Sequence, residues 1–184
     1  MSSEVKGLLE AIKALPLGET RLMEVCGTHT MAIAKAGIRS LLPANVKLLS
    51  GPGCPVCVTP SGVMDEVLRI SQLPNVTITT YGDLLRVPGS VPGDNLQRRS
   101  AQGADVRMVY SPMDSLDMAE QEPDREFIFL GVGFETTAPG TAIAVQEAKA
   151  RGRKNFSLLS LLKRTEPAMR AIIESDDFNV SGFL

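Results

Sequence analysis

The chain has 184 residues, of which 43% are apolar and 22% charged, a mixture typical of a soluble globular protein. Its formal net charge of −2 gives no basic surface of the kind that binds nucleic acid or an anionic membrane. No stretch approaches the roughly 18 apolar residues of a membrane span, and residues 1–10 lack the apolar core of a secretion signal. The composition therefore predicts a cytoplasmic protein.

Apolar, β-branched segments alternate with amphipathic segments along the chain. In order, the expected strands are 22–26, 46–50, 76–81, 106–110, 127–132 and 156–161. The expected helices are 5–15, 30–36, 59–72, 95–102, 113–120, 140–151 and 166–174. Local signals support several boundaries: Gly37 suits the end of one helix, and Thr59 with Pro60 suits the start of the next.

This alternation predicts the fold class, which is α/β with Rossmann-like βαβ units and a parallel sheet. The polar stretch 121–125 contains Pro123 and is the best candidate for a domain boundary. We therefore expect one complete α/β domain at 1–122 and the start of a second, incomplete α/β domain at 123–184. Ligands of parallel sheets gather at the carboxyl ends of the strands, so motifs that follow strands are the candidate sites.

The first such motif is Cys26-Gly27-Thr28-His29, directly after an expected strand. Gly27 allows a tight turn, and the N–H groups of the next helix would lower the pKa of Cys26 and favour its thiolate. His29 can reach the same centre, and the Gly27–Thr28 backbone is expected to approach a bound cofactor. Taken alone, either residue is better explained by a purely structural role, Cys26 as a small buried side chain and His29 as a side chain bonded to a carbonyl.

The second motif is Cys54-Pro55-Val56-Cys57, preceded by Gly53, which we also expect to approach a cofactor. Two cysteines separated by two residues are typical of a reversible dithiol or of half a tetrahedral metal site. Read together with Cys26 and His29, the spacing also matches a structural zinc site. Spacing alone leaves zinc, iron and a redox disulfide open. Both motifs end strands of βα units, which favours an open, reactive site.

A third motif, Gly133–Pro139, follows a later strand and offers a carboxylate and two hydroxyl groups. These three side chains are predicted to face a crevice: Glu135, Thr136 and Thr137. The alternative is a capping role, with Thr137 at the start of a helix. Two further carboxylates, Asp83 and Asp114, also follow strands, and we interpret them first as helix-start charges.

These motifs resemble the HypD family of [NiFe]-hydrogenase maturation proteins. The similar segments include the linking sequence and cover nearly the whole chain from about Arg21: 26–30, 36–43, 51–57, 81–90, 103–112 and 133–139. The resemblance implies a scaffold that holds iron while carbon monoxide and two cyanide ligands are attached to it.

On this chain the resemblance implies a division of roles. Cys26 would be the main thiolate on iron, with His29 close by. Cys54 and Cys57 would form a redox dithiol or supply further iron ligands. The same cleft would be lined by the third motif, Glu135, Thr136 and Thr137.

The resemblance also implies partners: a small HypC-type chaperone, a HypE-type cyanide donor and, indirectly, the hydrogenase large subunit. Longer family members carry a [4Fe–4S] cluster on cysteines of their carboxyl-terminal half, whereas no cysteine follows Cys57 here, so those ligands are absent. Two alternatives remain from the residues themselves. One is an interaction domain with a structural zinc on three cysteines and one histidine, and the other is a thiol–disulfide oxidoreductase that uses Cys54 and Cys57.

Overall fold

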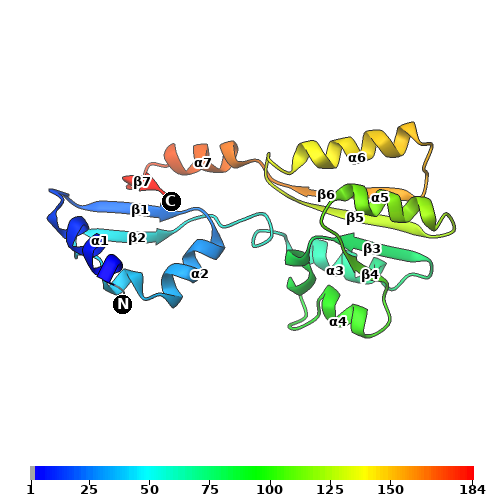
Figure 1. Cartoon of the computed structure of the whole chain (residues 1–184), viewed down its shortest axis with the longest axis horizontal. Coiled ribbons are helices and arrows are strands. Elements are labelled where there is room, and N and C mark those ends of the chain that lie inside the picture. Colours follow the sequence, from blue (N-terminus) through cyan, green and yellow to red (C-terminus); the bar gives the residue numbers. More distant parts are fainter. Residues whose placement is uncertain (1–2) are drawn as a thin grey trace. The chain divides into compact units, whose positions relative to one another are not determined.

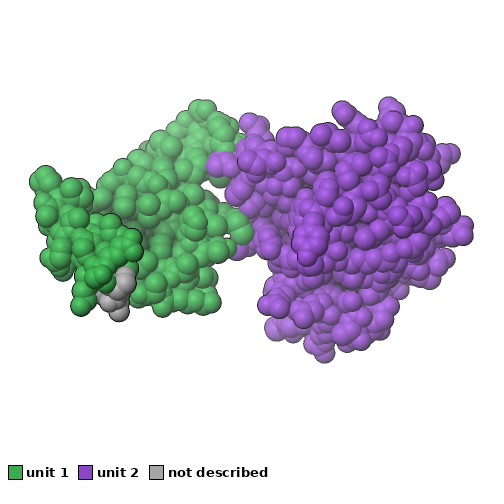
Figure 2. Space-filling view, viewed as in Figure 1, with its two compact units in different colours: residues 1–54, 166–184 green, residues 55–165 purple. Residues whose placement is uncertain are grey.

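The structure is a computed structural model that describes residues 3–184. These residues form two compact units, coloured separately in Figure 2. Unit 1 contains the described residues up to Cys54 together with Glu166–Leu184, and unit 2 is Pro55–Thr165.

This division differs from the boundary expected at 122/123. The polar stretch there is a turn inside unit 2 that joins a helix to the next strand, and its charges are used in local ion pairs. Arg125 bonds Asp105 at 2.8 Å, and Arg107 contacts Glu122. The proline and the charges therefore mark a tight connection within one unit.

Unit 1 is a parallel sheet with the strand order β2-β1-β7. Figure 1 shows α1 and α2 on one side of this sheet and α7 on the other. The elements are β1 (Thr20–Glu24), β2 (Val46–Ser50), β7 (Gly182–Phe183), α1 (Ser3–Ala14), α2 (Gly27–Lys35), the 3₁₀ turn η1 (Ile38–Ser40) and α7 (Thr165–Ile173), whose first residue belongs to unit 2.

Unit 2 is a parallel sheet with the strand order β4-β3-β5-β6, covered by α3 and α4 on one face and by α5 and α6 on the other (Figure 1). Its strands are β3 (Val76–Thr80), β4 (Val106–Met108), β5 (Glu126–Gly133) and β6 (Phe156–Leu162). Its helices are α3 (Ser61–Ile70), the 3₁₀ turn η2 (Gly82–Arg86), α4 (Leu96–Ala101), α5 (Pro112–Gln121) and α6 (Ala138–Ala150). The predicted α/β class with parallel βαβ units is confirmed.

The apolar core belongs to unit 2. One cluster fills the α3 face of the sheet: Met64, Val67, Leu68, Ile78, Leu84, Leu96, Leu130, Val132 and Leu161. Phe127 and Phe129 alternate with Leu130 along β5 and are fully buried on the other face. In the described part of unit 1, by contrast, the only fully buried residue is Glu24. A carboxylate is therefore the most enclosed side chain of the unit that carries Cys26.

Two local expectations have clear outcomes. Gly37 follows α2 with a φ of 65°, as a glycine at a helix end should. The predicted cap at Thr59 is wrong: α3 begins at Ser61 with Pro60 as its N-cap, and the buried Thr59 hydroxyl donates instead to the carbonyl of Pro55 at 2.9 Å.

None of the helices within residues 3–184 is long and apolar enough to span a bilayer.

Candidate functional site

The two thiol motifs leave the same edge of the unit 1 sheet. β1 and β2 are neighbouring parallel strands whose last residues, Glu24 and Ser50, are paired in register. Cys26 lies two residues beyond β1, and the chain beyond β2 runs through Gly51 to Cys54. Parallel strands that end together bring their following loops to one edge, which is where α/β proteins hold ligands.

Cys26 is the N-cap residue of α2, with an extended backbone (φ −133°, ψ 124°). The backbone N–H of His29 lowers the pKa of the Cys26 thiol most, burial of the half-buried side chain opposes it, and the backbone and hydroxyl of Thr28 lower it further. The thiol does not make a capping hydrogen bond of regular geometry. The first turn of α2 therefore acts on the sulfur chiefly as a set of N–H dipoles aimed at a charge.

A depressed thiol pKa predicts a specific pH profile. Cys26 should react with iodoacetamide below pH values at which an ordinary cysteine, with a pKa of about 8.5, has become protonated. The rate should fall only as the pH drops through the lowered pKa of Cys26, because only the thiolate attacks. Peptide mass spectrometry across a pH series measures this rate separately for each cysteine. A midpoint at the ordinary cysteine value would contradict the assignment.

The residue that sequence reasoning missed is Glu24. Its fully buried carboxylate accepts bonds from Arg39 Nη2 at 3.0 and 3.2 Å, and the same guanidinium nitrogen donates to the Ser50 hydroxyl at 3.2 Å. The Thr30 hydroxyl lowers the pKa of Glu24 most, burial opposes it, and Arg39 and the charge of His29 lower it further. The available signal was an acidic residue within the otherwise apolar run 22–26, which leads into a cysteine motif.

The second thiol motif forms a tight turn between β2 and α3. Gly53 enters it with a φ of 78°, a conformation that favours glycine. Cys54 is half-buried and is the last residue of unit 1 before the chain enters unit 2, and Cys57 is exposed in unit 2. Within residues 3–184, no three His, Cys, Asp or Glu side chains cluster closely enough to hold a metal ion. The structure thus places Cys26 and His29 on one helical turn without gathering all four predicted ligands.

The third motif lies at the carboxyl end of β5, in the sheet of unit 2. The exposed Glu135 carboxylate accepts bonds from the Thr165 N–H at 2.7 Å and from the Thr165 hydroxyl at 2.9 Å. The pKa of Glu135 is lowered first by its own backbone N–H and then by Thr165. Glu135 therefore holds the first residue of α7 through two hydrogen bonds, and no local sequence pattern predicted this contact. Thr137 is the N-cap of α6 without a side-chain cap bond, and Thr136 is exposed.

One of the two strand-end aspartates has the structural role expected of it. The Asp114 carboxylate accepts from the N–H groups of Tyr110 and Ser111, and the Ser111 hydroxyl caps α5 in return. This is a capping box, as expected for a helix-start charge. Asp83 lies in the first turn of η2.

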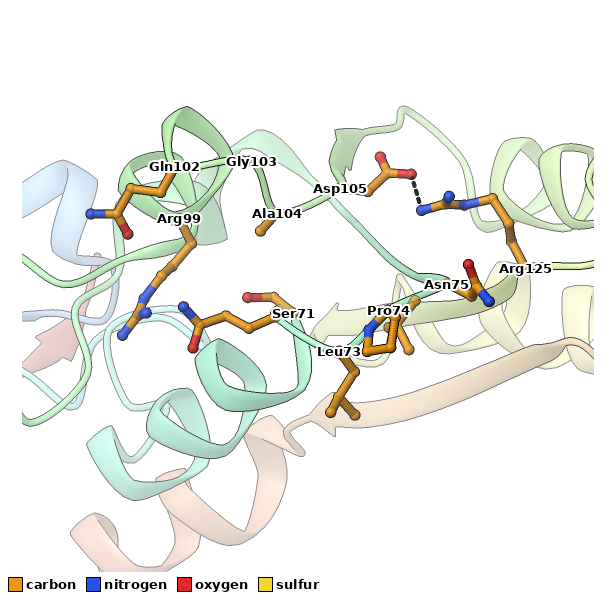
Figure 3. Close-up of a pocket in the computed structure, with 12 residues that line it drawn as sticks. Ser71, Leu73, Pro74, Asn75, Arg99, Gln102, Gly103, Ala104, Asp105 and Arg125 are labelled. Carbon is orange, nitrogen blue, oxygen red and sulfur yellow. Dashed lines mark hydrogen bonds and ion pairs between the residues drawn. The ribbon is translucent and has the colours of Figure 1, made fainter.

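A polar pocket of about 350 Å³ lies at the amino ends of β3, β4 and β5, the opposite end of the unit 2 sheet from the third motif (Figure 3). Three charged side chains line it, and each is in an ion pair: Arg125 pairs with Asp105 at 2.8 Å within the lining, and Arg99 pairs with Asp94 at 2.6 Å. The pocket contains no cysteine or histidine. These ion pairs indicate a structural role for the residues at this end of the sheet.

Comparisons with known proteins show which family the chain belongs to. The chain is 47% identical over 182 residues to the hydrogenase maturation factor HypD of Rhizobium leguminosarum bv. viciae, which covers 98% of the chain and 47% of that protein. It is 49% identical over 164 residues to HypD of Escherichia coli K12 (89% and 43%), and 40% identical over 182 residues to HypD of Rhodobacter capsulatus (99% and 48%). The chain therefore spans about half the length of these curated relatives. The profile of the family described as HypD, "Hydrogenase formation hypA family", matches residues 3–184, and the chain belongs to this family.

Proposed function

We propose that this chain acts in hydrogenase maturation as a cytoplasmic scaffold that holds iron, as cargo, while the Fe(CN)2(CO) group is assembled and delivered. The observation that carries the proposal is Cys26, a half-buried thiol with a lowered pKa at the start of α2, beside the strand end that leads to Cys54. Its setting within a HypD-family chain supports the same role.

The donor set suits this cargo. A thiolate is a soft ligand, and soft ligands stabilise iron that carries cyanide and carbon monoxide. Cys26 would provide the main thiolate, and His29, three residues on, would approach the iron from the same turn. The backbone at Gly27, Thr28 and Gly53 would line the space around it.

Cys54 and Cys57 would serve as the redox dithiol, or add ligands to iron. Oxidation of two thiols to one disulfide releases two electrons and two protons. A partner protein would accept both electrons, or one of them if the iron passes from the ferric to the ferrous state, and the protons would pass to solvent. Glu135, Thr136 and Thr137 would shape a face for ligand or partner. The partners proposed are a HypC-type chaperone, a HypE-type cyanide donor and, through them, the hydrogenase large subunit.

Anaerobic reconstitution with iron tests the proposal. The chain, incubated with ferrous iron and a HypC-type protein, should retain iron and form a complex. When cyanide and carbon monoxide ligands are present, the complex should show their infrared stretching bands. Cys26→Ala should abolish iron retention and weaken the complex, while circular dichroism remains that of the parent chain.

Ser40→Ala is the matched control, because Ser40 is an exposed residue of unit 1 outside the thiol motifs. Two results would refute the scaffold. One is tight binding of one zinc per chain with unfolding on chelation, the behaviour of a structural zinc site. The other is the absence of any complex with a HypC-type protein.

A further inference from the structure

The unit 2 sheet has two outer strands, and they differ in length and composition. β4 is three residues long, and Arg107 at its centre is held in ion pairs with Asp105 and Glu122. β6 is seven residues long, with the sequence Phe-Ser-Leu-Leu-Ser-Leu-Leu. Proteins shorten or charge their outer strands because unpaired backbone groups there can pair with another chain. β6 is neither short nor charged.

The register of β6 with β5 fixes which of its backbone groups are unpaired. The Phe127 N–H donates to the Asn155 carbonyl, and the Lys163 N–H donates to the Gly133 carbonyl. The parallel pairing is continuous between these two bonds, so odd-numbered residues of β6 bond β5 and even-numbered residues point their N–H and C=O groups away from it. Within residues 3–184, β6 pairs with no other strand. The outward groups therefore belong to four residues: Phe156, Leu158, Ser160 and Leu162.

Packing on both faces of the sheet holds β6 in place. Leu161 belongs to the apolar cluster on the α3 face, and Leu159 packs against that cluster. On the other face, a Cβ at Gly131 would lie 2.8 Å from Leu158 Cδ1 and 3.4 Å from Thr141 Cγ2, so Leu158 packs against both β5 and α6. The free edge is therefore preorganised, which lowers the entropic cost of pairing with a further strand.

Basic side chains stand at both ends of β6. Lys154 lies two residues before the strand and Lys163 directly follows it, and neither ammonium group forms an ion pair with the described residues. Two copies of β6 related by two-fold symmetry would pair antiparallel, which would bring the basic end of each beside the basic end of the other. This repulsion disfavours a second copy as the occupant. A segment with carboxylates on both sides of an apolar centre would complement both ends.

The helix that packs on β6 adds an uncharged surface (Figure 1). α6 has no charged residue from Ala138 to Gln146, and within this stretch Ile143 is 53% exposed and Val145 42% exposed. An apolar partner of β6 therefore has exposed apolar side chains of α6 to cover as well, and such surfaces mark interaction sites.

We infer that the free edge of β6 binds an extended segment of a partner protein, with an apolar centre and acidic residues on both sides. The segment would join the sheet as a further strand and bond the four outward-facing residues of β6. Its carboxylates would pair with Lys154 and Lys163. The inference concerns unit 2 alone and uses none of the thiols, so it stands or fails separately from the proposed scaffold.

A labelled synthetic peptide, Glu-Glu-Val-Thr-Val-Thr-Val-Glu-Glu, is the probe. Its two ends are alike, so it can add to β6 in either direction. Fluorescence anisotropy with the full chain should show binding, and a peptide with lysine in place of every glutamate should not bind. Hydrogen exchange followed by NMR should show new protection of the Leu158 and Leu162 N–H groups, whereas those of Leu159 and Leu161 are already protected by β5 in the free chain.

Ser160→Pro tests the edge itself. It removes one outward N–H and leaves the bonds to β5, because proline is tolerated on an outer strand where the N–H faces away from the sheet. Binding of the probe should weaken by about fivefold or more. Ser160→Ala is the matched control: it keeps the N–H and should bind the probe as the parent chain does.

Lys154→Glu tests the charge, and it carries the test if Ser160→Pro fails to fold. Binding should weaken by about three- to fivefold at low salt, and the difference should shrink as the salt concentration rises. Lys47→Glu makes the same change of charge at an exposed position of β2 in unit 1 and should leave binding unchanged.

Three results would overturn the inference. The first is that the glutamate probe does not bind, or binds no better than the lysine peptide. The second is unchanged binding in a folded Ser160→Pro variant or in Lys154→Glu. The third is dimerisation of the chain that Ser160→Pro abolishes, which would assign the edge to a second copy.

Discussion

Replacing Gly51 with alanine is expected to lower the free energy of unfolding of unit 1 by about 2–3 kcal/mol, the upper part of the range for overpacking a tight site. A Cβ at this position would lie 2.5 Å from the Glu24 carbonyl oxygen and 2.8 Å from Met23 Cγ. The Gly51 N–H donates to that same carbonyl at 2.8 Å, so the added methyl group presses against the bond that closes the strand ends. The side chain of Met23 can move, but the backbone of Glu24 can move only by separating β1 from β2.

Separation of these strands would also displace the start of both thiol loops, so Gly51→Ala should raise the pKa of Cys26 as well as destabilise the unit. Hydrogen exchange followed by mass spectrometry measures the local stability of peptides from β1 and β2. Gly7→Ala in α1 is the control in the same unit, because a Cβ at Gly7 meets nothing within 4 Å. That change should be neutral or stabilising by up to about 1 kcal/mol, as alanine favours a helix. Unchanged exchange in Gly51→Ala would show that the strand ends tolerate the methyl group.

Features governed by local chemistry were predictable from the sequence. The inner strand β5 of unit 2 is a continuous apolar run from Phe127 to Leu130 because helices bury both of its faces, and such a run is recognisable without knowledge of the fold. Gly37 and the Ser111–Asp114 box end and start helices through bonds within a few residues. The placement of Cys26 after β1 followed from the same alternation of strand and helix.

Features made by distant segments were not predictable in this way. β7 consists of two residues whose pairing with Leu22 and Met23 joins positions about 160 apart, and no periodicity marks so short a strand. The separation into two sheets arises because β1 pairs with β2 and β7, whereas β3 pairs with β4 and β5. The strand sequences are similar in length and composition, so the sequence alone does not show which strands pair.

The same limit applies to the candidate site. Glu24 and Arg39 are 15 positions apart, and Glu135 and Thr165 are 30 apart. The sequence shows each as an ordinary charged or polar residue. Only the fold shows that Arg39 pairs with the buried Glu24 carboxylate close to Cys26, and that Glu135 hydrogen-bonds Thr165, the first residue of α7.

The largest loss of stability is expected from Phe129→Ala, about 3–5 kcal/mol, the range found when a buried phenylalanine is truncated to alanine. Phe129 is fully buried on β5, an inner strand of the unit 2 sheet, between Thr79 of β3 and Leu158 of β6. Its ring also meets Tyr81 edge to face, with 5.4 Å between centroids. Truncation would leave a cavity where two strands and the covering helices meet, and a parallel sheet closed on both faces has little freedom to collapse into it.

Urea unfolding followed by the fluorescence of Tyr81 and Tyr110, both in unit 2, measures the effect. Phe178→Ala is the matched control: it removes the same ring from unit 1, where the side chain is 38% exposed, and should leave the unit 2 transition within about 0.5 kcal/mol of the parent value. Equal losses in the two variants would mean that the apolar contacts of β5 do not dominate the stability of unit 2. A large loss confined to Phe129→Ala would show that the apolar contacts of β5 supply much of the stability of unit 2. Unit 1 differs, because its only fully buried residue within the described chain is Glu24, the carboxylate near Cys26.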